Sequence, residues 1–311
     1  MCAVLTARPS NHSVGRFAVV LGTNEIASAV GVYLQRDGWS VVLAHDPHPP
    51  VIRRKMAFHD VMFGDPAEVD GVLGAYAGDG LQVLKVLGRA DRIAVTRLSP
   101  LDVLAIRSVD LLVDARMQKH HVTPDLRSLA RLTIGLGPRF SVNLNCDIAV
   151  ETRPAKNGAI VRNGKTDDAD GVARRLGDVG AERFVYSSAP GCWRTSVEIG
   201  ASIIKESILG HLNGLLVRAP FDGILRGIVR DGTDVPAGIK LLEVDPRGPD
   251  AQWTGMDERG RTIAKATLDA IRIHAAQQQS ASLSTRDVSS QLSPRPASQP
   301  RFPRIMEANV T

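Results

Sequence analysis

The turn after the first apolar run of the chain has part of a residue pattern that binds dinucleotides. It reads Gly22-Thr23-Asn24-Glu25-Ile26-Ala27 and opens a helical pattern. The full pattern is G-x-G-x-x-G/A, and its second glycine lets the backbone approach a pyrophosphate. Asn24 replaces that glycine, and Glu25 competes with a phosphate for the amides of the helix N-terminus. We expect ligand contacts from the backbone of Gly22, Thr23 and Asn24, with an ordinary strand-to-helix turn as the alternative.

Cations that could hold a phosphate follow the second apolar run. Arg53 and Arg54 lie in the segment Val51–Lys55, and a guanidinium offers a two-pronged donor to a phosphate. Asp46 lies 24 residues after Gly22, where an acid that binds ribose is expected. Because Asn24 and Glu25 disfavour a pyrophosphate on the first turn, we expect any phosphate on Arg53 and Arg54. The alternative is that this segment is a solvated run of charges.

Two later turns could complete the same site. The stretch from Asp114 to His121 offers a carboxylate and several cations, and we place Asp114 and Lys119 on the opposite wall. The turn at Gly135 and Gly137 would let a ligand come close to the backbone. His120 and His121 are adjacent, so their rings point in different directions and chelate a metal poorly. We therefore predict no metal site, and a polar surface loop is the alternative for this stretch.

No group of residues in the sequence forms a recognisable catalytic centre. The chain has no G-x-S-x-G and no H-E-x-x-H, and Glu151 and Glu243 stand alone in strand-like runs. Cys146 and Cys192 suit the commoner role of small buried residues. Residues 158–166 resemble a phosphate-binding P-loop but have one residue too many between the glycines, so Asn163-Gly164 predicts a hairpin. We predict no catalytic residue.

The elements that would position these residues form an α/β pattern. Residues 17–22 and 39–46 predict strands, and apolar spacing predicts a helix over 25–36 between them. Residues 109–115 and 132–137 predict two more strands. We therefore expect a Rossmann-like domain over residues 17–150, after a flexible N-terminus at 1–16. In such open sheets ligands bind beyond the carboxyl ends of the strands, where all the turns above lie.

Short strand-like pieces separated by glycine and proline turns predict a small all-β domain over residues 151–257. Residues 217–246 resemble a biotinyl- or lipoyl-type hammerhead, which implies a barrel-sandwich fold. Such carrier domains hold a modifiable lysine in the hairpin where this chain has Asp245-Pro246, so we reject a carrier role. A closing helix is predicted over 258–279. The polar composition of 280–311 predicts a disordered C-terminal tail.

Composition bounds the partners and the compartment. The 311 residues carry a net charge of +5 with scattered basic residues and 4% aromatics, which argues against nucleic-acid binding. No apolar run approaches the roughly 18 residues that cross a bilayer, so no membrane is expected. The N-terminus lacks the order of a secretory signal. The three cysteines are far apart, which favours a reducing, cytoplasmic location.

Several stretches together resemble the YqeB family of the selenium-dependent molybdenum hydroxylase system, itself similar in outline to XdhC-type accessory factors. They are VVLGTNEIASAVGVYLQRDGWSVVLAH, PPVIRRKMAFHDVMFG, VDLLVDARMQKHHVTP, IGLGPRFSVNLNCDIAVETRP, VYSSAPG and APFDGILRGIVRDGTDVPAGIKLLEVDPRG, in the order of the family. The resemblance covers roughly residues 17–250. It implies an accessory protein for maturation of a molybdenum hydroxylase of the xanthine-dehydrogenase kind. The implied ligand is the molybdenum cofactor, bound transiently, or a nucleotide.

Three hypotheses for function follow. The first is a non-enzymatic maturation factor that binds a nucleotide or the phosphate of the molybdenum cofactor at the strand ends, with the hydroxylase as its partner. The second is an NAD(P)-dependent oxidoreductase, with Asp46 on the ribose and His120 or His121 as the acid or base. The third is an interaction protein whose nucleotide site has decayed. The sequence leaves self-association into a homo-oligomer open.

Overall fold

The computed structural model describes residues 15–119 and 123–291, the last eleven of them, 281–291, as helical backbone only. The described residues up to Ala270 form one compact unit, and those from Ile271 on belong to a second. Most of the N-terminus predicted as flexible lies outside the described residues. In the second unit, residues 271–291 continue the last helix of the chain.

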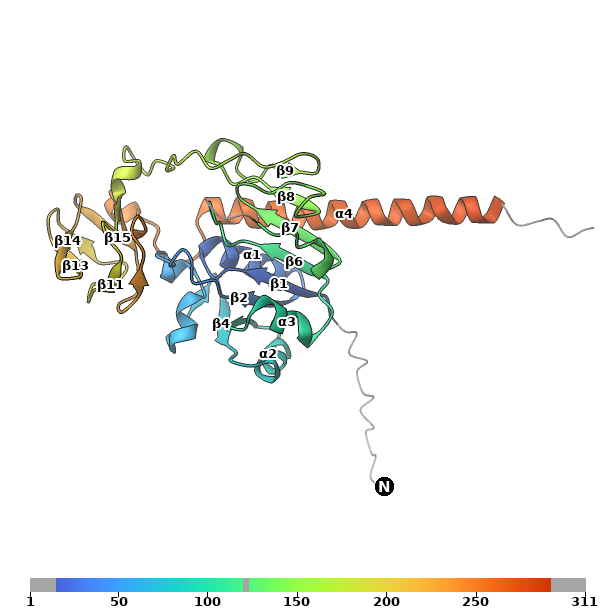
Figure 1. Ribbon diagram of the computed structural model, residues 1–311, viewed down its shortest axis with the longest axis horizontal. Coiled ribbons are helices and arrows are strands. Elements are labelled where there is room, and N and C mark those ends of the chain that lie inside the picture. Colours follow the sequence, from blue (N-terminus) through green and yellow to red (C-terminus); the bar gives the residue numbers. More distant parts are fainter. Residues whose placement is uncertain (1–14, 120–122, 292–311) are drawn as a thin grey trace, which may run out of the picture. The chain divides into compact units, whose positions relative to one another are not determined.

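A nine-stranded sheet is the largest element of the first unit (Figure 1). The strand order is β3-β4-β5-β2-β1-β6-β7-β8-β9, and all neighbours are parallel except the β3–β4 and β8–β9 pairs. The strands are β1 (Phe17–Leu21), β2 (Ser40–Ala44), β3 (Glu68–Val69), β4 (Val72–Tyr76), β5 (Arg92–Thr96), β6 (Leu111–Asp114), β7 (Leu132–Leu136), β8 (Ile148–Val150) and β9 (Ile160–Val161). The central strands are apolar at nearly every position because both faces of the sheet are covered.

Short helices cover the two faces of this sheet. Helix α1 (Glu25–Arg36) lies so close to the strands that a Cβ atom added at Gly31 would be 3.0 Å from the Leu43 side chain. Helices α2 (Gly80–Leu87) and α3 (Pro100–Ile106) contribute Val83 and Val103 to a separate buried cluster with Phe17, Val19 and Leu21. Alternate residues of β1 therefore serve two different cores, as the period of a strand requires.

The first part of the C-terminal helix α4 (Glu258–Gln291) packs in the first unit near α1. Ile263, Ala264 and Leu268 are buried there, and a Cβ atom at Gly260 would lie 3.3 Å from that of Ala29. The helix was predicted over 258–279 and continues to Gln291; the rest of the predicted tail, residues 292–311, lies outside the described residues. Among the helices that the structure describes, none has the length and apolar character to cross a membrane.

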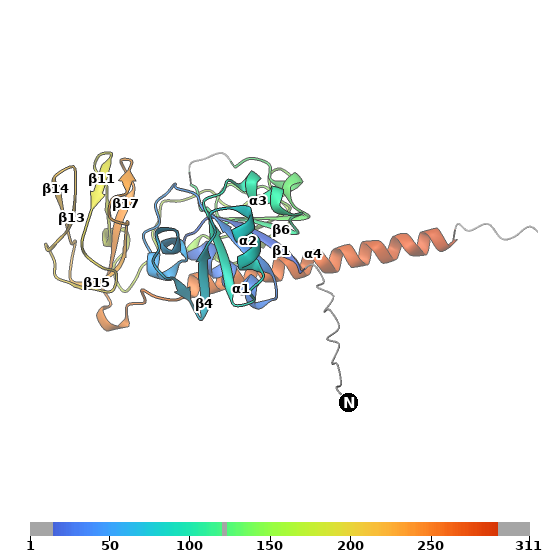
Figure 2. The ribbon, with the colours of Figure 1, turned by 90° about the horizontal axis from the view of Figure 1, so that it is seen from below.

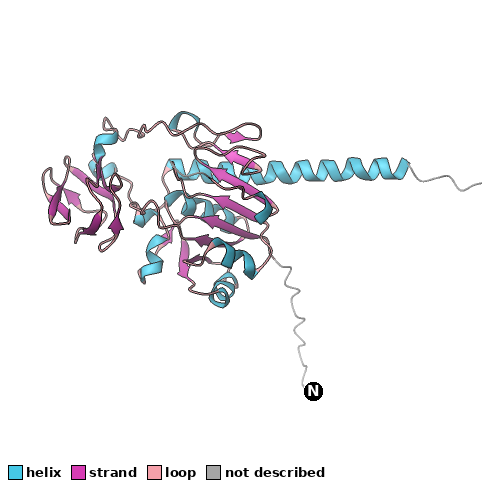
Figure 3. Cartoon of the chain, viewed as in Figure 1, coloured by secondary structure: helices cyan, strands magenta, loops and turns pink. Residues whose placement is uncertain are grey.

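Residues 184–245 form two four-stranded sheets that share a second core (Figures 2 and 3). One has the order β10-β17-β15-β12 and the other β14-β13-β11-β16, with antiparallel pairing throughout. The strands are β10 (Phe184–Tyr186), β11 (Gly191–Arg194), β12 (Ser202–Ile203), β13 (Ile208–Leu212), β14 (Leu215–Arg218), β15 (Gly223–Ile228), β16 (Asp234–Val235) and β17 (Lys240–Asp245). Trp193 is fully buried in their core and donates its indole N–H to the Val229 carbonyl.

The expected fold class, a Rossmann-like domain plus a barrel-sandwich hammerhead and a disordered tail, is wrong. The main sheet is mixed, and the described parts of the β6–β7 and β7–β8 connections contain no α-helix, only a 3₁₀ turn at Arg127–Leu129. Helix α4, which follows β8 by more than a hundred residues, supplies part of the missing cover. Local periodicity identified single strands and this helix, but not that the helix packs beside strands so far from it along the chain.

Candidate functional site

A cleft of about 820 Å³ opens beyond the carboxyl ends of β1, β2, β6 and β7. Its other wall comes from β10, from the turn before β17 and from the start of α4. Basic side chains outnumber acidic ones in its lining. The basic ones are Arg53, Arg116, Lys119, Arg153, Arg174, Arg183, Arg226, Lys240, Arg247 and Arg259, and the acidic ones are Glu25, Asp170, Asp257 and Glu258. The remainder of the lining is largely apolar, so the cleft suits an organic anion better than a small hydrated ion.

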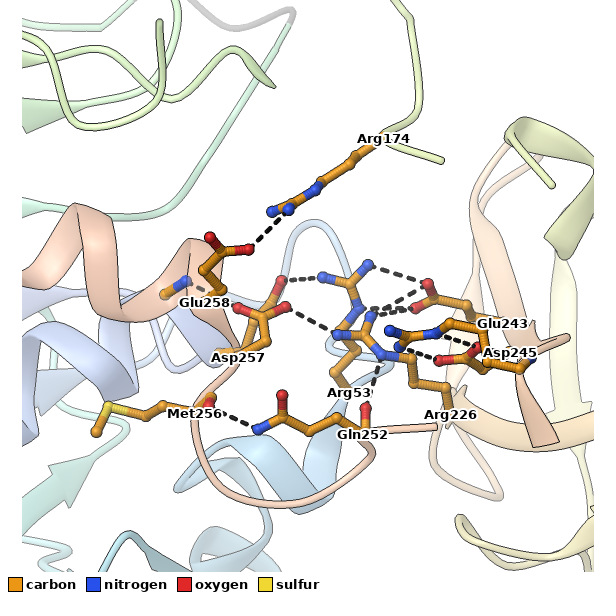
Figure 4. Close-up of polar contacts among 12 residues, drawn as sticks. Arg53, Arg174, Arg226, Glu243, Asp245, Gln252, Met256, Asp257 and Glu258 are labelled. Carbon is orange, nitrogen blue, oxygen red and sulfur yellow. Dashed lines mark hydrogen bonds and ion pairs between the residues drawn. The ribbon is translucent and has the colours of Figure 1, made fainter. Parts of the chain in front are cut away.

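Behind one wall of the cleft, three arginines surround a single fully buried carboxylate, Glu243; Figure 4 shows two of them, Arg53 and Arg226. Arg53 donates to Glu243 from Nε and Nη2 at 2.7 and 3.2 Å, and its Nη1 donates to Glu25 at 2.9 Å. Arg183 donates to Glu243 at 2.8 Å, and Arg226 at 3.2 Å. The cluster therefore joins the loop after β2 to β15 and β17.

The charges of this cluster are nearly balanced. Arg226 donates to Asp257, just before α4, at 2.8 Å, so three guanidinium groups face three carboxylates. Burial alone would raise the pKa of Glu243, but the charges of Arg53 and Arg226 hold that pKa well below its ordinary value. The same carboxylates raise the pKa of Arg53 despite its burial. Arg53 is therefore a structural cation, with little charge left for a ligand.

Most of the other arginines of the cleft are also paired with carboxylates. Arg116 makes a two-pronged contact with Asp114, at 3.0 and 2.7 Å, and Arg247 makes the same contact with Asp245, at 2.9 and 2.6 Å. Arg174 pairs with Glu258 at 2.8 Å (Figure 4). Arg153 pairs with Asp167 and Asp170. These pairs shape the walls and neutralise much of the basic lining.

Three cations of the lining, Lys119, Lys240 and Arg259, are not paired in this way. No carboxylate among the described residues lies within 4.0 Å of any of them. Lys240 holds its ammonium group 3.6 Å from the centre of the Phe184 ring, and Arg259 makes one hydrogen bond of 3.3 Å, to the Thr152 carbonyl. Burial and the neighbouring charges of Arg53 and Lys119 lower the pKa of Lys240 to about 8.

In the turn after β1, the Asn24 side chain caps helix α1, so it occupies backbone amides that a ligand would otherwise bind. The Asn24 side chain accepts hydrogen bonds from the backbone of Ile26 and Ala27 and donates to the Ala115 carbonyl at 2.8 Å. Asn24 lines the cleft, whereas Gly22, with φ of +110°, packs against Ala115. Thr23 is buried, and its hydroxyl lies 3.0 Å from the His59 ring.

Of the ten residues predicted to bind a ligand, Asn24, Arg53 and Lys119 line the cleft. Asp46 accepts from Gln118 at 2.9 Å, and Asp114 is buried against Arg116. A Cβ atom at Gly135 would lie only 2.0 Å from the Phe140 ring, so that ring fills the space expected for a ligand. Gly137, with φ of +105°, lies against Met117.

The second predicted phosphate cation, Arg54, lies outside the cleft. It is buried, donates to Asp60 at 2.6 Å, and donates to the Ile228 carbonyl at 3.0 Å. It also borders a separate cavity of about 460 Å³. Arg54 therefore ties the loop after β2 to β15, and Lys55 is the only exposed cation of the predicted charged run.

His120 and His121, the acid or base of the oxidoreductase hypothesis, lie outside the described residues. Within the described residues, no group of three or more His, Cys, Asp or Glu side chains is arranged to hold a metal ion. The residues predicted from the sequence to bind a ligand did not include four cations of the cleft: Arg183, Arg226, Lys240 and Arg259. One signal was available, because a lone glutamate in an apolar strand such as Glu243 requires buried cations as partners.

The chain is similar in sequence to a known protein of Escherichia coli. No family model matches the chain. A protein of Escherichia coli K12 described as uncharacterized YqeB is 28% identical over 270 residues, which is 86% of this chain and 49% of that protein. The similarity supports the resemblance to YqeB, and the chain spans about half the length of this curated relative.

Some solved structures have a weak likeness to the chain. They are the ectoine utilization protein EutE (DoeB) of Ruegeria pomeroyi, an aspartoacylase family protein of Mesorhizobium loti, and a succinylglutamate desuccinylase/aspartoacylase of Rhodobacter sphaeroides. The sequence identities are 12%, 11% and 12%, and the TM-scores are 0.24, 0.24 and 0.25. The matches cover 75%, 74% and 76% of this chain and 85%, 85% and 87% of those chains.

Proposed function

We propose that the chain is a non-enzymatic accessory factor that binds a phosphate-bearing cofactor in the basic cleft, for delivery to a molybdenum hydroxylase. The single observation that carries the binding half is the lining of the cleft, which combines an apolar surface with unpaired cations. The molybdenum cofactor fits this chemistry, because it joins a flat heterocycle to a phosphate. Asn24 and Lys119 follow β1 and β6, Lys240 begins β17, and Arg259 lies near the start of α4.

The arrangement favours binding over catalysis. The arginines around Glu243 are already protonated and are each held by several hydrogen bonds, so they are poor proton acceptors. The lining contains no cysteine among the described residues; Cys146 lies in the core, where burial raises its pKa to about 12. Such a thiol is a poor nucleophile.

The molybdenum part of the proposal depends on the sequence resemblance alone. The relative from Escherichia coli is described as uncharacterized, so its name adds no activity. A carrier of a labile cofactor needs a cleft that a partner protein can reach, and we propose the cleft between β10 and the strand ends for that role. The client enzyme would be of the xanthine-dehydrogenase kind.

The test is binding of released molybdenum cofactor to the purified chain. The cofactor would be freed from a molybdenum hydroxylase, mixed with the chain under anaerobic conditions and separated by gel filtration, with pterin fluorescence and metal content measured in the protein peak. We expect co-elution near one cofactor per chain. No retention, together with full hydroxylase activity in cells that lack the gene, would overturn the proposal. Tight binding of NADH or NADPH instead would favour the oxidoreductase hypothesis.

A further inference from the structure

We propose that Lys240 is a reactive amine that binds an anionic aldehyde in the cleft covalently, as an imine. This inference goes beyond the proposed function and does not depend on it, because it concerns the chemistry of one side chain toward one class of ligand. Reversible imine formation is binding without turnover, so it is compatible with a non-enzymatic role.

Lys240 is placed where its amine can meet a ligand. It is the first residue of β17 and opposes Tyr186 in the β10–β17 pair, so a strand rather than a loop holds its backbone. Lys240, Tyr186 and Phe184, the ring that the amine contacts, all line the cleft. The volume of about 820 Å³ leaves room for an organic molecule beside these side chains.

The contacts of the Lys240 amine disfavour its charged form. Among the described residues, no carboxylate lies within 4.0 Å of Nζ. Nζ lies 3.6 Å from the centre of the Phe184 ring, and the guanidinium carbon of Arg183 lies 4.3 Å from the same centre. The two cations are therefore no farther apart than the sum of these distances, and they share one ring. The carboxylate of Glu243 is already engaged by three arginines, so it does not neutralise Lys240.

The pKa of Lys240 agrees with these contacts. Burial is the largest cause that lowers it, to about 8, and the charges of Arg53, Lys119 and Arg183 lower it further against the opposing charge of Glu243. At pH 7.5 roughly a quarter of an amine with that pKa is neutral, compared with about one part in 800 for an ordinary lysine. Only the neutral amine has a lone pair that can attack a carbonyl. Burial beside other cations is a known way to make a lysine nucleophilic.

The proposed step needs only the amine and an aldehyde. The lone pair of Nζ forms a bond to the carbonyl carbon, and the carbonyl oxygen then leaves as water with the two hydrogens of the amine, so that a C=N bond remains. Burial raises the pKa of the neighbouring Tyr186, so its hydroxyl stays neutral at physiological pH and adds no negative charge. An anionic ligand is favoured because Lys119, a lining residue without a described carboxylate within 4.0 Å, adds to the positive field at Lys240.

The experiment traps the imine on the full chain with two aldehyde probes, pyridoxal 5′-phosphate and the uncharged pyridoxal. Samples taken over time at pH 7.5 are reduced with sodium borohydride, which converts each imine to a stable secondary amine, and peptide mass spectrometry gives the modified fraction at every lysine. Lys85 and Lys205 are exposed outside the cleft and serve as references within the same sample. We expect Lys240 to react at least tenfold faster than either reference, with a larger preference for the phosphorylated probe.

A pH series adds a readout that simple exposure of a lysine would not give. The ratio of the rate at Lys240 to the rate at Lys205 should be constant below pH 7.5 and fall severalfold between pH 8 and 9.5, because Lys240 is then fully neutral while the reference still loses protons. Changes in the probe itself cancel in this ratio. Lys119→Met should lower the preference of Lys240 for the phosphorylated probe, and Lys205→Met should not. A ratio near one at pH 7.5, or a ratio that does not change with pH, would overturn the inference.

The outcomes for this inference and for the proposed function are separable. If Lys240 is trapped selectively but the molybdenum cofactor is not retained, the inference stands and the proposed function is wrong. If the cofactor co-elutes but Lys240 reacts no faster than Lys85 and Lys205, the function stands and the inference is wrong. Lys240→Arg, which keeps the positive charge without the nucleophile, should lose the selective trapping. Urea unfolding of this variant and of Lys119→Met confirms that both are folded.

Discussion

Arg53 and Glu243 are separated by 190 positions in the chain, yet two N–H groups of Arg53 meet the two carboxylate oxygens of Glu243 at 2.7 and 3.2 Å. Glu243 is fully buried and also accepts from Arg183 and Arg226. A buried charge network of this kind adds little net stability when complete, but removing one member is costly. It fixes the loop after β2 against the small sheets, and so fixes one wall of the cleft.

The first prediction is that Glu243→Gln destabilises the protein by about 3–5 kcal/mol, because it leaves the charges of three buried arginines without their shared partner. Urea unfolding followed by tryptophan fluorescence measures the change, since Trp39 and Trp193 are buried. The matched control is Glu258→Gln. That residue pairs with Arg174 at an exposed position, so its loss should cost less than about 1 kcal/mol. Equal effects of the two variants would contradict a buried network.

Several elements of the main sheet could be predicted from the sequence because their signal is local. The strands expected at 17–22, 39–46, 109–115 and 132–137 are confirmed as β1, β2, β6 and β7, and the helix at 25–36 is confirmed as α1. Strands β4 and β5 and helices α2 and α3 were not identified. Helices α2 and α3 have eight residues or fewer, which is too short for a clear helical repeat of apolar residues. Strand β4 is interrupted by Gly74, which weakens its alternation of apolar residues.

The charge network could not be predicted because it depends on strand register. Glu243 lies opposite Phe184 in the β10–β17 pair and opposite Gly227 in the β15–β17 pair. Arg183 and Arg226 each directly precede one of those two positions, and a bulge in β15 lies beside Gly227. A shift of one residue would turn these side chains to the other face. No local pattern fixes that register. The sequence alone therefore could not show that Arg53 is paired with a buried carboxylate and not available to a phosphate.

The second prediction concerns the cap of α1. Asn24→Ala removes two hydrogen bonds to the helix N-terminus and one to the Ala115 carbonyl, so it should destabilise the protein by about 1–2 kcal/mol. Asn24→Asp keeps the capping oxygen but places an oxygen where the N–H group faces the Ala115 carbonyl, so it should recover only part of this loss. Thermal unfolding of both variants measures the effect. If Asn24→Ala were as stable as wild type, the capping geometry of the turn would be incorrect.

The third prediction distinguishes packing from ligand approach at Gly135. A Cβ atom there would lie 2.0 Å from the Phe140 ring, so Gly135→Ala should destabilise the protein by about 1–3 kcal/mol through overpacking. Gly80→Ala is the control, because the nearest atom to its added Cβ would be 3.5 Å away, an ordinary contact. Urea unfolding compares them. A ligand-approach role would instead leave the stability of Gly135→Ala unchanged and lower only its ligand affinity.

The last prediction is an acid-dependent loss of stability caused by His59. This ring is buried beside Thr23, and burial, followed by the charges of His45 and Arg54, lowers its pKa to about 3. In the unfolded chain the same histidine titrates near about 6.5. Between these two values the unfolded state binds the extra proton, so stability is present above pH 6.5 and falls as the pH drops toward 3. The slope from this one group approaches about 1.4 kcal/mol per pH unit.

His59→Gln tests this dependence. The variant loses the histidine packing and is therefore less stable than wild type at pH 7, but the gap should narrow as the pH falls from 6.5 to 4.5. Free energies of unfolding from urea titrations at half-unit steps give the two slopes. His211→Gln is the control, because His211 is exposed on β13 and its removal should leave the slope unchanged. Parallel wild-type and His59→Gln curves would mean that the buried ring takes up a proton in the folded state as readily as in the unfolded one.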